Sequence, residues 1–237
     1  MNTNRKTARM AGALYLSYIV VWTLSGVIGR SHVSVDGDAA ATAGNLLASA
    51  GQLRTGIVGE LAAGVLFLLT AWALYVLLKP VNRSLALLFL LLNVGGVAIQ
   101  CFNELNLWAA LLLSSGADYL KAFQTGQLQA LAMLFLQLYD HGFWMCQIFF
   151  GAWLFPLGYL IFKSGILPRA LGGVLMVHCV VWLTTFLQHF LYPDLAAITY
   201  ISYPLGFIAE FGLTLWLLVM GAREQQPAAI QTSWLPE

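Results

Sequence analysis

Residues 84–113 read SLALLFLLLNVGGVAIQCFNELNLWAALLL, and Glu104 is the single charged side chain among them. A helix needs about 20 mostly apolar residues to cross a hydrocarbon layer of roughly 30 Å, where only bonds within the helix can satisfy its backbone. The stretch therefore predicts a transmembrane helix. Because a charge inside a span is costly, Glu104 also marks a candidate functional position.

Five further stretches have the same apolar character. Together with residues 84–113 they predict an all-α integral membrane bundle of six transmembrane helices, which we expect to form a single domain over residues 1–237. The predicted spans cover residues 10–29, 54–78, 84–113, 128–162, 168–191 and 196–220. The fourth is longer than a bilayer requires, so we expect it to tilt, kink or project beyond the membrane.

The composition of the chain also indicates lipid as its solvent. Of the 237 residues, 60% are hydrophobic and 9% are charged, whereas soluble domains carry about 25% charged residues. The formal net charge of +1 argues against nucleic acid as a partner. The three cysteines lie inside apolar runs, so we expect no disulfide framework.

The basic residues predict that both termini lie in the cytoplasm. Six spans place both ends on one side, and loops rich in Lys and Arg stay inside the cell. The side with the termini holds Arg5, Lys6, Arg9, Lys79, Arg83, Lys163, Arg169 and Arg223, and the other side holds Arg30, Arg54 and Lys121.

The first outer loop contains an alanine-rich run between Asp38 and Gly51. This pattern predicts a short helix over about residues 38–50, capped by Asp38 and ended by the glycine. A plain connector is the alternative.

Polar side chains recur inside spans two to six. The candidates for a pocket wall are Glu60, Gln100, Asn103, Glu104, Gln137, Asp140, His141, Trp144, His178, Trp182, His189, Tyr203 and Glu210. Four of the ionisable candidates are Glu60, Glu104, His141 and His189. At a rise of 1.5 Å per residue, each lies about 28–33 Å from the basic residue at the predicted cytoplasmic end of its helix. Glu210 and His178 lie deeper. We therefore expect one polar recess that opens to the extracytoplasmic side and narrows toward the midplane.

Helical spacing supports a shared recess, because residues three or four apart lie on the same face. The candidates of the third, fourth, fifth and sixth spans each form one such stripe. In the alternative interpretation, these polar groups only bind the helices to one another.

A metal site is one hypothesis for this cluster. Mixed histidine and carboxylate ligands suit zinc or iron. The candidate ligands are Glu104, Asp140, His141 and His189. The chain has no H-E-x-x-H, G-x-S-x-G or phosphate-loop motif, so the sequence assigns no catalytic residue.

Several segments of the chain resemble a known family. They are residues 5–12 (RKTARMAG), 77–84 (LLKPVNRS), 149–154 (FFGAWL), 164–169 (SGILPR) and 210–221. This pattern resembles the bacterial multi-pass membrane proteins catalogued as domain of unknown function 4386, over nearly the whole chain. The resemblance implies a bacterial or archaeal inner membrane and assigns no activity.

Three functions remain open from the sequence. The first is a sensor, assembly or accessory protein with a polar pocket for a lipid-like or small-molecule ligand. The second is a membrane-embedded metal-dependent hydrolase that acts on a lipid-like substrate. The third is a small proton-coupled transporter that uses Glu210 and Asp140.

Overall fold

The computed structural model describes residues 3–193, 195 and 197–223. Every regular element in these residues is helical: α1 (Thr3–Arg30), α2 (Ala39–Ala48), α3 (Ala50–Leu78), α4 (Arg83–Leu113), η1 (Asp118–Ala122), α5 (Thr125–Ala152), α6 (Leu154–Ser164), α7 (Arg169–Leu191), α8 (Ala197–Gly206), η2 (Phe207–Phe211) and α9 (Gly212–Val219). The start of the predicted sixth span, at residue 196, and both ends of the predicted domain lie outside the described residues.

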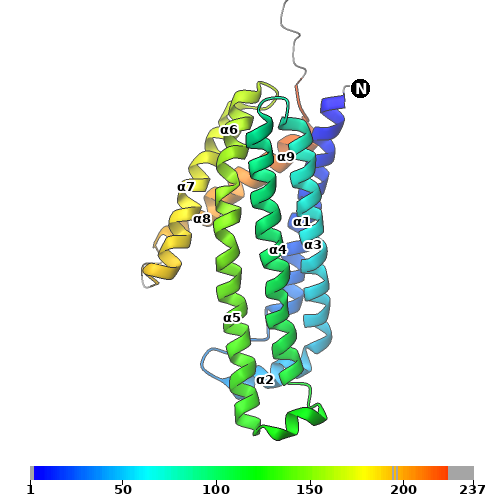
Figure 1. The fold of residues 1–237 in the computed structure, drawn as a ribbon, viewed down its shortest axis with the longest axis vertical. Helices are drawn as coiled ribbons and strands as arrows, with labels where there is room; N and C mark the ends of the chain where they lie inside the picture. Colours follow the sequence, from blue (N-terminus) through cyan, green and yellow to red (C-terminus); the bar gives the residue numbers. More distant parts are fainter. Residues whose placement is uncertain (1–2, 194, 196, 224–237) are drawn as a thin grey trace, which may run out of the picture.

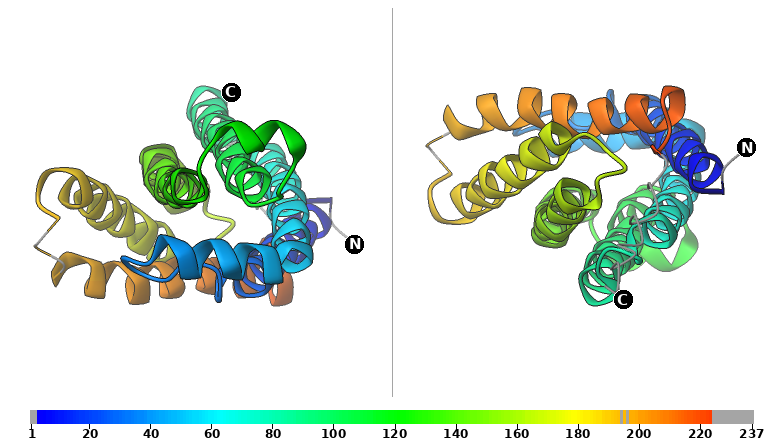
Figure 2. Two further views of the ribbon diagram at one scale, coloured as in Figure 1. Left: turned by 90° about the horizontal axis from the view of Figure 1, so that it is seen from below. Right: turned by 90° about the horizontal axis from the view of Figure 1, so that it is seen from above.

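Six helical segments are long and apolar enough to cross a membrane, which confirms the predicted all-α bundle (Figure 1). They are Asn4–Arg30, Ala50–Leu78, Arg83–Leu113, Thr125–Ser164, Arg169–Leu191 and Thr199–Val219. Viewed along the bundle, α7 and α8 extend to one side of the other helices (Figure 2).

The fourth span, Thr125–Ser164, contains 40 residues and is broken at Trp153, between α5 and α6. Pro156 follows the break and has no amide hydrogen, so it cannot bond to the carbonyl of Ala152 as a helical residue would. The long span is therefore divided into two helices at a residue in its interior.

Small residues allow α1 and α3 to pack closely along their length. At their crossing, a Cβ built on Gly56 would lie 2.7 Å from Gly29 Cα. Such contact between backbones is typical of membrane helices, where lipid leaves no hydrophobic force to drive the helices together.

Helix α2 lies in the connection between the first two spans and covers that end of the bundle (Figure 1). Asp38 caps it by accepting a hydrogen bond from the Ala41 amide at 2.8 Å. The predicted end at Gly51 differs from the structure: the break falls at Ser49, and Gly51 has no positive φ and lies inside α3. Leu46 of α2 is fully buried in a small apolar cluster with residues of α3, α4 and α5.

A larger apolar core fills the opposite half of the bundle around Trp153 and the leucines of α6. The outer faces carry many exposed apolar side chains, for example Phe102 at 75% exposure and Leu105 at 56%. Soluble proteins rarely expose apolar surface of this extent, whereas a lipid environment favours it.

Candidate functional site

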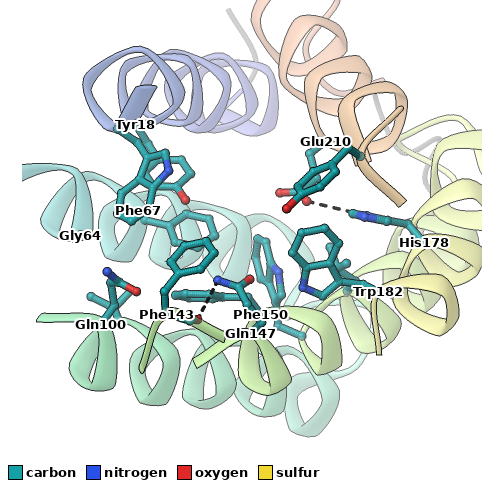
Figure 3. Close-up of a pocket in the computed structure, with 15 residues that line it drawn as sticks. Tyr18, Gly64, Phe67, Gln100, Phe143, Gln147, Phe150, His178, Trp182 and Glu210 are labelled. Carbon is teal, nitrogen blue, oxygen red and sulfur yellow. Dashed lines mark hydrogen bonds and ion pairs between the residues drawn. The ribbon is translucent and has the colours of Figure 1, made fainter. Parts of the chain in front are cut away.

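A cavity of about 250 Å³ lies among the helices and shares Phe67, Val97 and Trp153 with the main core (Figure 3). Side chains of α1, α3, α4, α5, α6, α7, α8 and η2 line it. The lining residues are Tyr18, Trp22, Gly64, Phe67, Val97, Gln100, Phe143, Gln147, Phe150, Trp153, Leu154, His178, Trp182, Tyr203 and Glu210.

Glu210 and His178 form the polar end of this cavity (Figure 3). One carboxylate oxygen of Glu210, Oε2, accepts a hydrogen bond from the Tyr15 hydroxyl. The other, Oε1, lies 3.7 Å from Nδ1 of His178, which suits an ion pair but is too long for a hydrogen bond. Both ring nitrogens of His178 are buried without a hydrogen-bond partner.

The local backbone places Glu210 at the cavity. Pro204 lies inside α8, and the next turn, Phe207–Phe211, is a π-helix. An extra residue in such a turn shifts the side chains that follow it, and π-helical turns occur often at functional sites. Gly206 lies against the imidazole: a Cβ there would be 2.8 Å from His178 Nε2, so glycine leaves the space that the ring needs.

Aromatic rings form most of the remaining wall. Tyr18 and Phe67 stack with ring centroids 4.2 Å apart, and Trp22 and Phe143 stack at 6.2 Å. Near the polar end, Trp182 meets the His178 ring edge-on at 5.5 Å. The cavity therefore suits a ligand with a flat or apolar body and a polar group directed at Glu210.

Gln100 lies at the far side of the cavity from Glu210 (Figure 3). Its side-chain amide donates to Oε1 of Glu104 at 3.3 Å, and its oxygen accepts from the Cys146 thiol at 3.1 Å. Oε2 of Glu104 is buried without a hydrogen-bond partner. Gln100 thus stands between the cavity and a second buried carboxylate.

Behind Gln100 is a buried charged cluster formed by Arg30, Glu60, Glu104 and Tyr139. Arg30 forms an ion pair with Glu60 at 3.1 Å and also donates to the Tyr139 hydroxyl, which in turn donates to Glu60 at 2.7 Å. Glu104 is close enough to Glu60 and Arg30 to interact electrostatically with both side chains. The cluster contains two carboxylates and one guanidinium group.

The structure divides the thirteen pocket candidates into separate environments instead of one recess. Gln100, His178, Trp182, Tyr203 and Glu210 line the cavity. Glu60 and Glu104 belong to the charged cluster, and Asn103 beside them donates to the Tyr139 carbonyl at 2.8 Å. The remaining candidates are Gln137, Asp140, His141, Trp144 and His189.

These remaining residues lie outside the cavity, mainly between α5 and α7. His189 stacks on Trp144 at 4.5 Å and lies 5.9 Å from His141, measured between ring centroids. Gln137, Asp140 and His141 are exposed. The buried face of α5 carries Tyr139, Cys146 and Gln147 instead, because the helix is rotated by about one residue from the predicted orientation.

The four candidate metal ligands are distributed between two of these environments. Glu104 is buried in the charged cluster, whereas Asp140 and His141 are exposed on α5. Among the described residues, no group of three or more His, Cys, Asp or Glu side chains is arranged to hold a metal ion. The predicted ligands Glu104, Asp140, His141 and His189 are therefore not brought together as one set within the described part of the chain.

Sequence reasoning missed the aromatic wall and the partners of the buried carboxylates. Tyr15, Tyr18 and Trp22 follow one another at steps of three and four on α1, which was a detectable signal for one helix face. Arg30 and Tyr139 gave no comparable signal, since their contacts with Glu60 connect segments 30 and 79 residues away in sequence.

The fold and its apolar outer surface define the class: the chain is a multi-pass membrane protein with six helices that can span a bilayer. Residues 10–221 match the family described as "Domain of unknown function (DUF4386)". Because this match covers most of the chain, the protein belongs to that family.

A segment of 121 residues is 30% identical to a protein of Archaeoglobus fulgidus named "Uncharacterized protein". The segment covers 51% of this chain and 59% of the relative, so the chain spans little more than half of the relative's length. No solved structure matches the chain.

Proposed function

We propose that this protein is a ligand-binding membrane protein, with a sensor or accessory role, and that its cavity receives a small molecule with an aromatic or apolar body. The observation that carries this proposal is the pair Glu210 and His178 in the wall of an aromatic cavity. Ligand pockets are typically apolar concavities with a few convergent polar groups of this kind.

The unpaired imidazole argues against a purely structural role for the polar residues. The side chain of His178 is 2% exposed, and neither ring nitrogen has a hydrogen-bond partner. An unsatisfied buried polar group costs about 1–3 kcal/mol, so a group that only held helices together would be expected to have a partner. A ligand in the cavity supplies one.

The main apolar core lies between the cavity and the predicted cytoplasmic end. Leu157, Leu160 and Ile161 of α6 are fully buried there, together with Leu74 and Leu78 of α3. We therefore expect ligands to enter from the extracytoplasmic side or from the bilayer, near α7 and α8, which extend to one side of the other helices (Figure 2).

Thermal unfolding of the detergent-purified protein tests this proposal. The panel is phenethylamine, propylbenzene and hydrocinnamate, which present a cationic, a neutral and an anionic group on the same phenyl body. At least one compound should raise the melting temperature in a saturable manner, because binding to the folded state stabilises it by mass action.

Two matched variants locate the binding. Val97→Phe adds volume inside the cavity, whereas Val94→Phe makes the same change at an exposed position of α4. We expect the first to abolish stabilisation and the second to retain it. The proposal is contradicted if no compound stabilises the protein, or if Val97→Phe responds like the unmodified chain.

A further inference from the structure

We infer that the ligand is an organic ammonium compound, with its charged nitrogen at Glu210 and its apolar body between the aromatic rings. This inference rests on the proposed ligand-binding function and specifies the ligand's chemical class. It is carried by the charge balance of the cavity, the positions of the rings and the unpaired nitrogens of His178.

The lining of the cavity has a carboxylate but no matching cation. Glu210 is the one acidic side chain among the lining residues, and none of them is Lys or Arg. Its Oε2 atom is bonded to a neutral hydroxyl, that of Tyr15. A cationic ligand supplies the missing counter-charge, whereas an anionic ligand meets repulsion at the only charged wall residue.

The charged cluster behind Gln100 contributes no cation to the cavity wall. Behind Gln100, the two carboxylates of Glu60 and Glu104 face a single guanidinium, Arg30. The guanidinium is bonded to Glu60 and Tyr139, and it does not line the cavity.

The aromatic wall favours the same class of ligand. Ring faces attract cations through the negative charge of their π systems, and a buried cation–π contact is worth more than an exposed one. Trp182 stands beside Glu210 and His178, and Phe143 and Phe150 lie between that end and Gln100 (Figure 3). A carboxylate combined with rings can hold an ammonium group and the carbon body attached to it.

His178 offers the ammonium group a second hydrogen-bond acceptor beside Glu210. Its Nδ1 lies 3.7 Å from Glu210 Oε1, a gap that leaves both atoms without a direct hydrogen bond. A primary ammonium has three hydrogens to donate, so it can bond to the carboxylate oxygen and also to an unprotonated ring nitrogen. If His178 were instead protonated as the counter-ion of Glu210, a neutral ligand would bind as well as a cation.

Isothermal titration calorimetry at neutral pH distinguishes these cases. Phenethylamine and propylbenzene have the same shape, and they differ in an ammonium group that replaces a methyl group. We expect the amine to bind roughly 10- to 100-fold more tightly, the range that a charge-assisted hydrogen bond provides.

Glu210→Gln should remove this preference, because it deletes the charge and keeps an oxygen for Tyr15. Unchanged binding of propylbenzene shows that the variant is folded. Tyr15→Phe is a second variant that keeps the carboxylate, and it should retain the preference. Asp118→Asn, which removes an exposed carboxylate of the η1 segment, is the matched charge control.

The outcomes separate this inference from the proposed function. If propylbenzene or hydrocinnamate binds at least as tightly as the amine, and Val97→Phe abolishes that binding, the ammonium inference is overturned and the ligand-binding function stands. An amine preference that survives Glu210→Gln also overturns the inference. If no compound shows binding that depends on Val97, the proposed function fails as well.

Discussion

Arg30 shows how one residue can decide whether buried acids are tolerated. Its guanidinium lies at the end of α1 and is the cation of the charged cluster, where Glu60 is 3% exposed. Charges taken out of water need both a counter-charge and hydrogen bonds. Arg30 and Tyr139 together supply these for Glu60, and they do so only in part for Glu104.

Arg30→Met should therefore destabilise the protein strongly. It leaves two buried carboxylates without a cation, and breaking a buried pair in this way costs about 3 kcal/mol. Chemical or thermal unfolding in detergent measures the loss. Arg54→Met, at an exposed position of α3, is the control and should have little effect. Equal losses in the two variants would show that the cluster contributes no specific stability.

Gly206 provides a test of how His178 is positioned. A Cβ at this residue lies 2.8 Å from the imidazole, so Gly206→Ala should force the ring to rotate away from Glu210. Among the signals of the four histidines in an NMR spectrum of ring-labelled protein, we expect one to shift. Gly212→Ala, where the nearest atom outside the helix is 3.8 Å away, should leave all of them in place.

The sequence predicted these residues unevenly, for physical reasons. Glu210 and His178 were identifiable because ionisable groups are rare and costly inside spans. Tyr18 and Phe67 were not, because an aromatic residue in an apolar helix is compatible with lipid, a helix contact or a cavity wall. Which of these applies depends on the rotation of each helix, and the buried face of α5 shows that an error of one residue exchanges Tyr139 for Asp140.

At the scale of elements, the long apolar helices follow from the sequence, whereas their breaks do not. Each span needs only length and apolar composition, which are visible in the chain. The π-helical turn follows Pro204, and the break at Trp153 precedes Pro156. A proline leaves one carbonyl of its helix without a donor, and where the backbone adjusts to this depends on the neighbouring helices. Both breaks border the cavity, since Trp153 and Glu210 line it.

The contact between α1 and α3 gives a prediction for an element pair. Gly56→Ala places a Cβ 2.7 Å from Gly29 Cα and 3.0 Å from the Ser25 carbonyl, so the two backbones must separate. Overpacking of this kind costs about 1–3 kcal/mol. Unfolding measurements should show that loss.

Gly51→Ala provides the matched comparison, because nothing lies within 4 Å of a Cβ at that position of α3. Alanine has a higher helix propensity than glycine, by about 1 kcal/mol, so this variant should be as stable as the original chain or more so. If both substitutions had the same effect, close packing of α1 on α3 would not contribute to stability.

At the scale of the whole molecule, contacts place the described ends of the chain on the same side of the bundle. Arg9 of α1 donates to the Val219 carbonyl at the end of α9, at 3.0 Å. The amide of Arg223 donates to the Ile166 carbonyl in the connection between α6 and α7, at 2.9 Å. These bonds join three chain segments at the end that carries most of the basic residues (Figure 1).

The distribution of basic residues predicts that this end of the bundle faces the cytoplasm. Of the three basic residues at the opposite end, Arg30 is bound to Glu60 and Lys121 to Asp118, at 3.1 and 2.6 Å. Acidic partners contribute little to the orientation of a membrane protein, so the prediction rests on the count of Lys and Arg, eight against three. We therefore expect the loop after α3 to face the cytoplasm and the loop after α4 to face outward.

Single cysteines test this orientation when they are introduced into a variant whose native Cys101, Cys146 and Cys179 have been replaced. Ser115→Cys lies after α4 and should react with a membrane-impermeant maleimide in intact cells, whereas Pro80→Cys, after α3, should react only once the membrane is permeabilised. The reverse labelling pattern would show that the whole bundle has the opposite orientation in the membrane. Inversion would also place the α6 core on the outer side of the cavity, and we would then expect the ligand to enter from inside the cell.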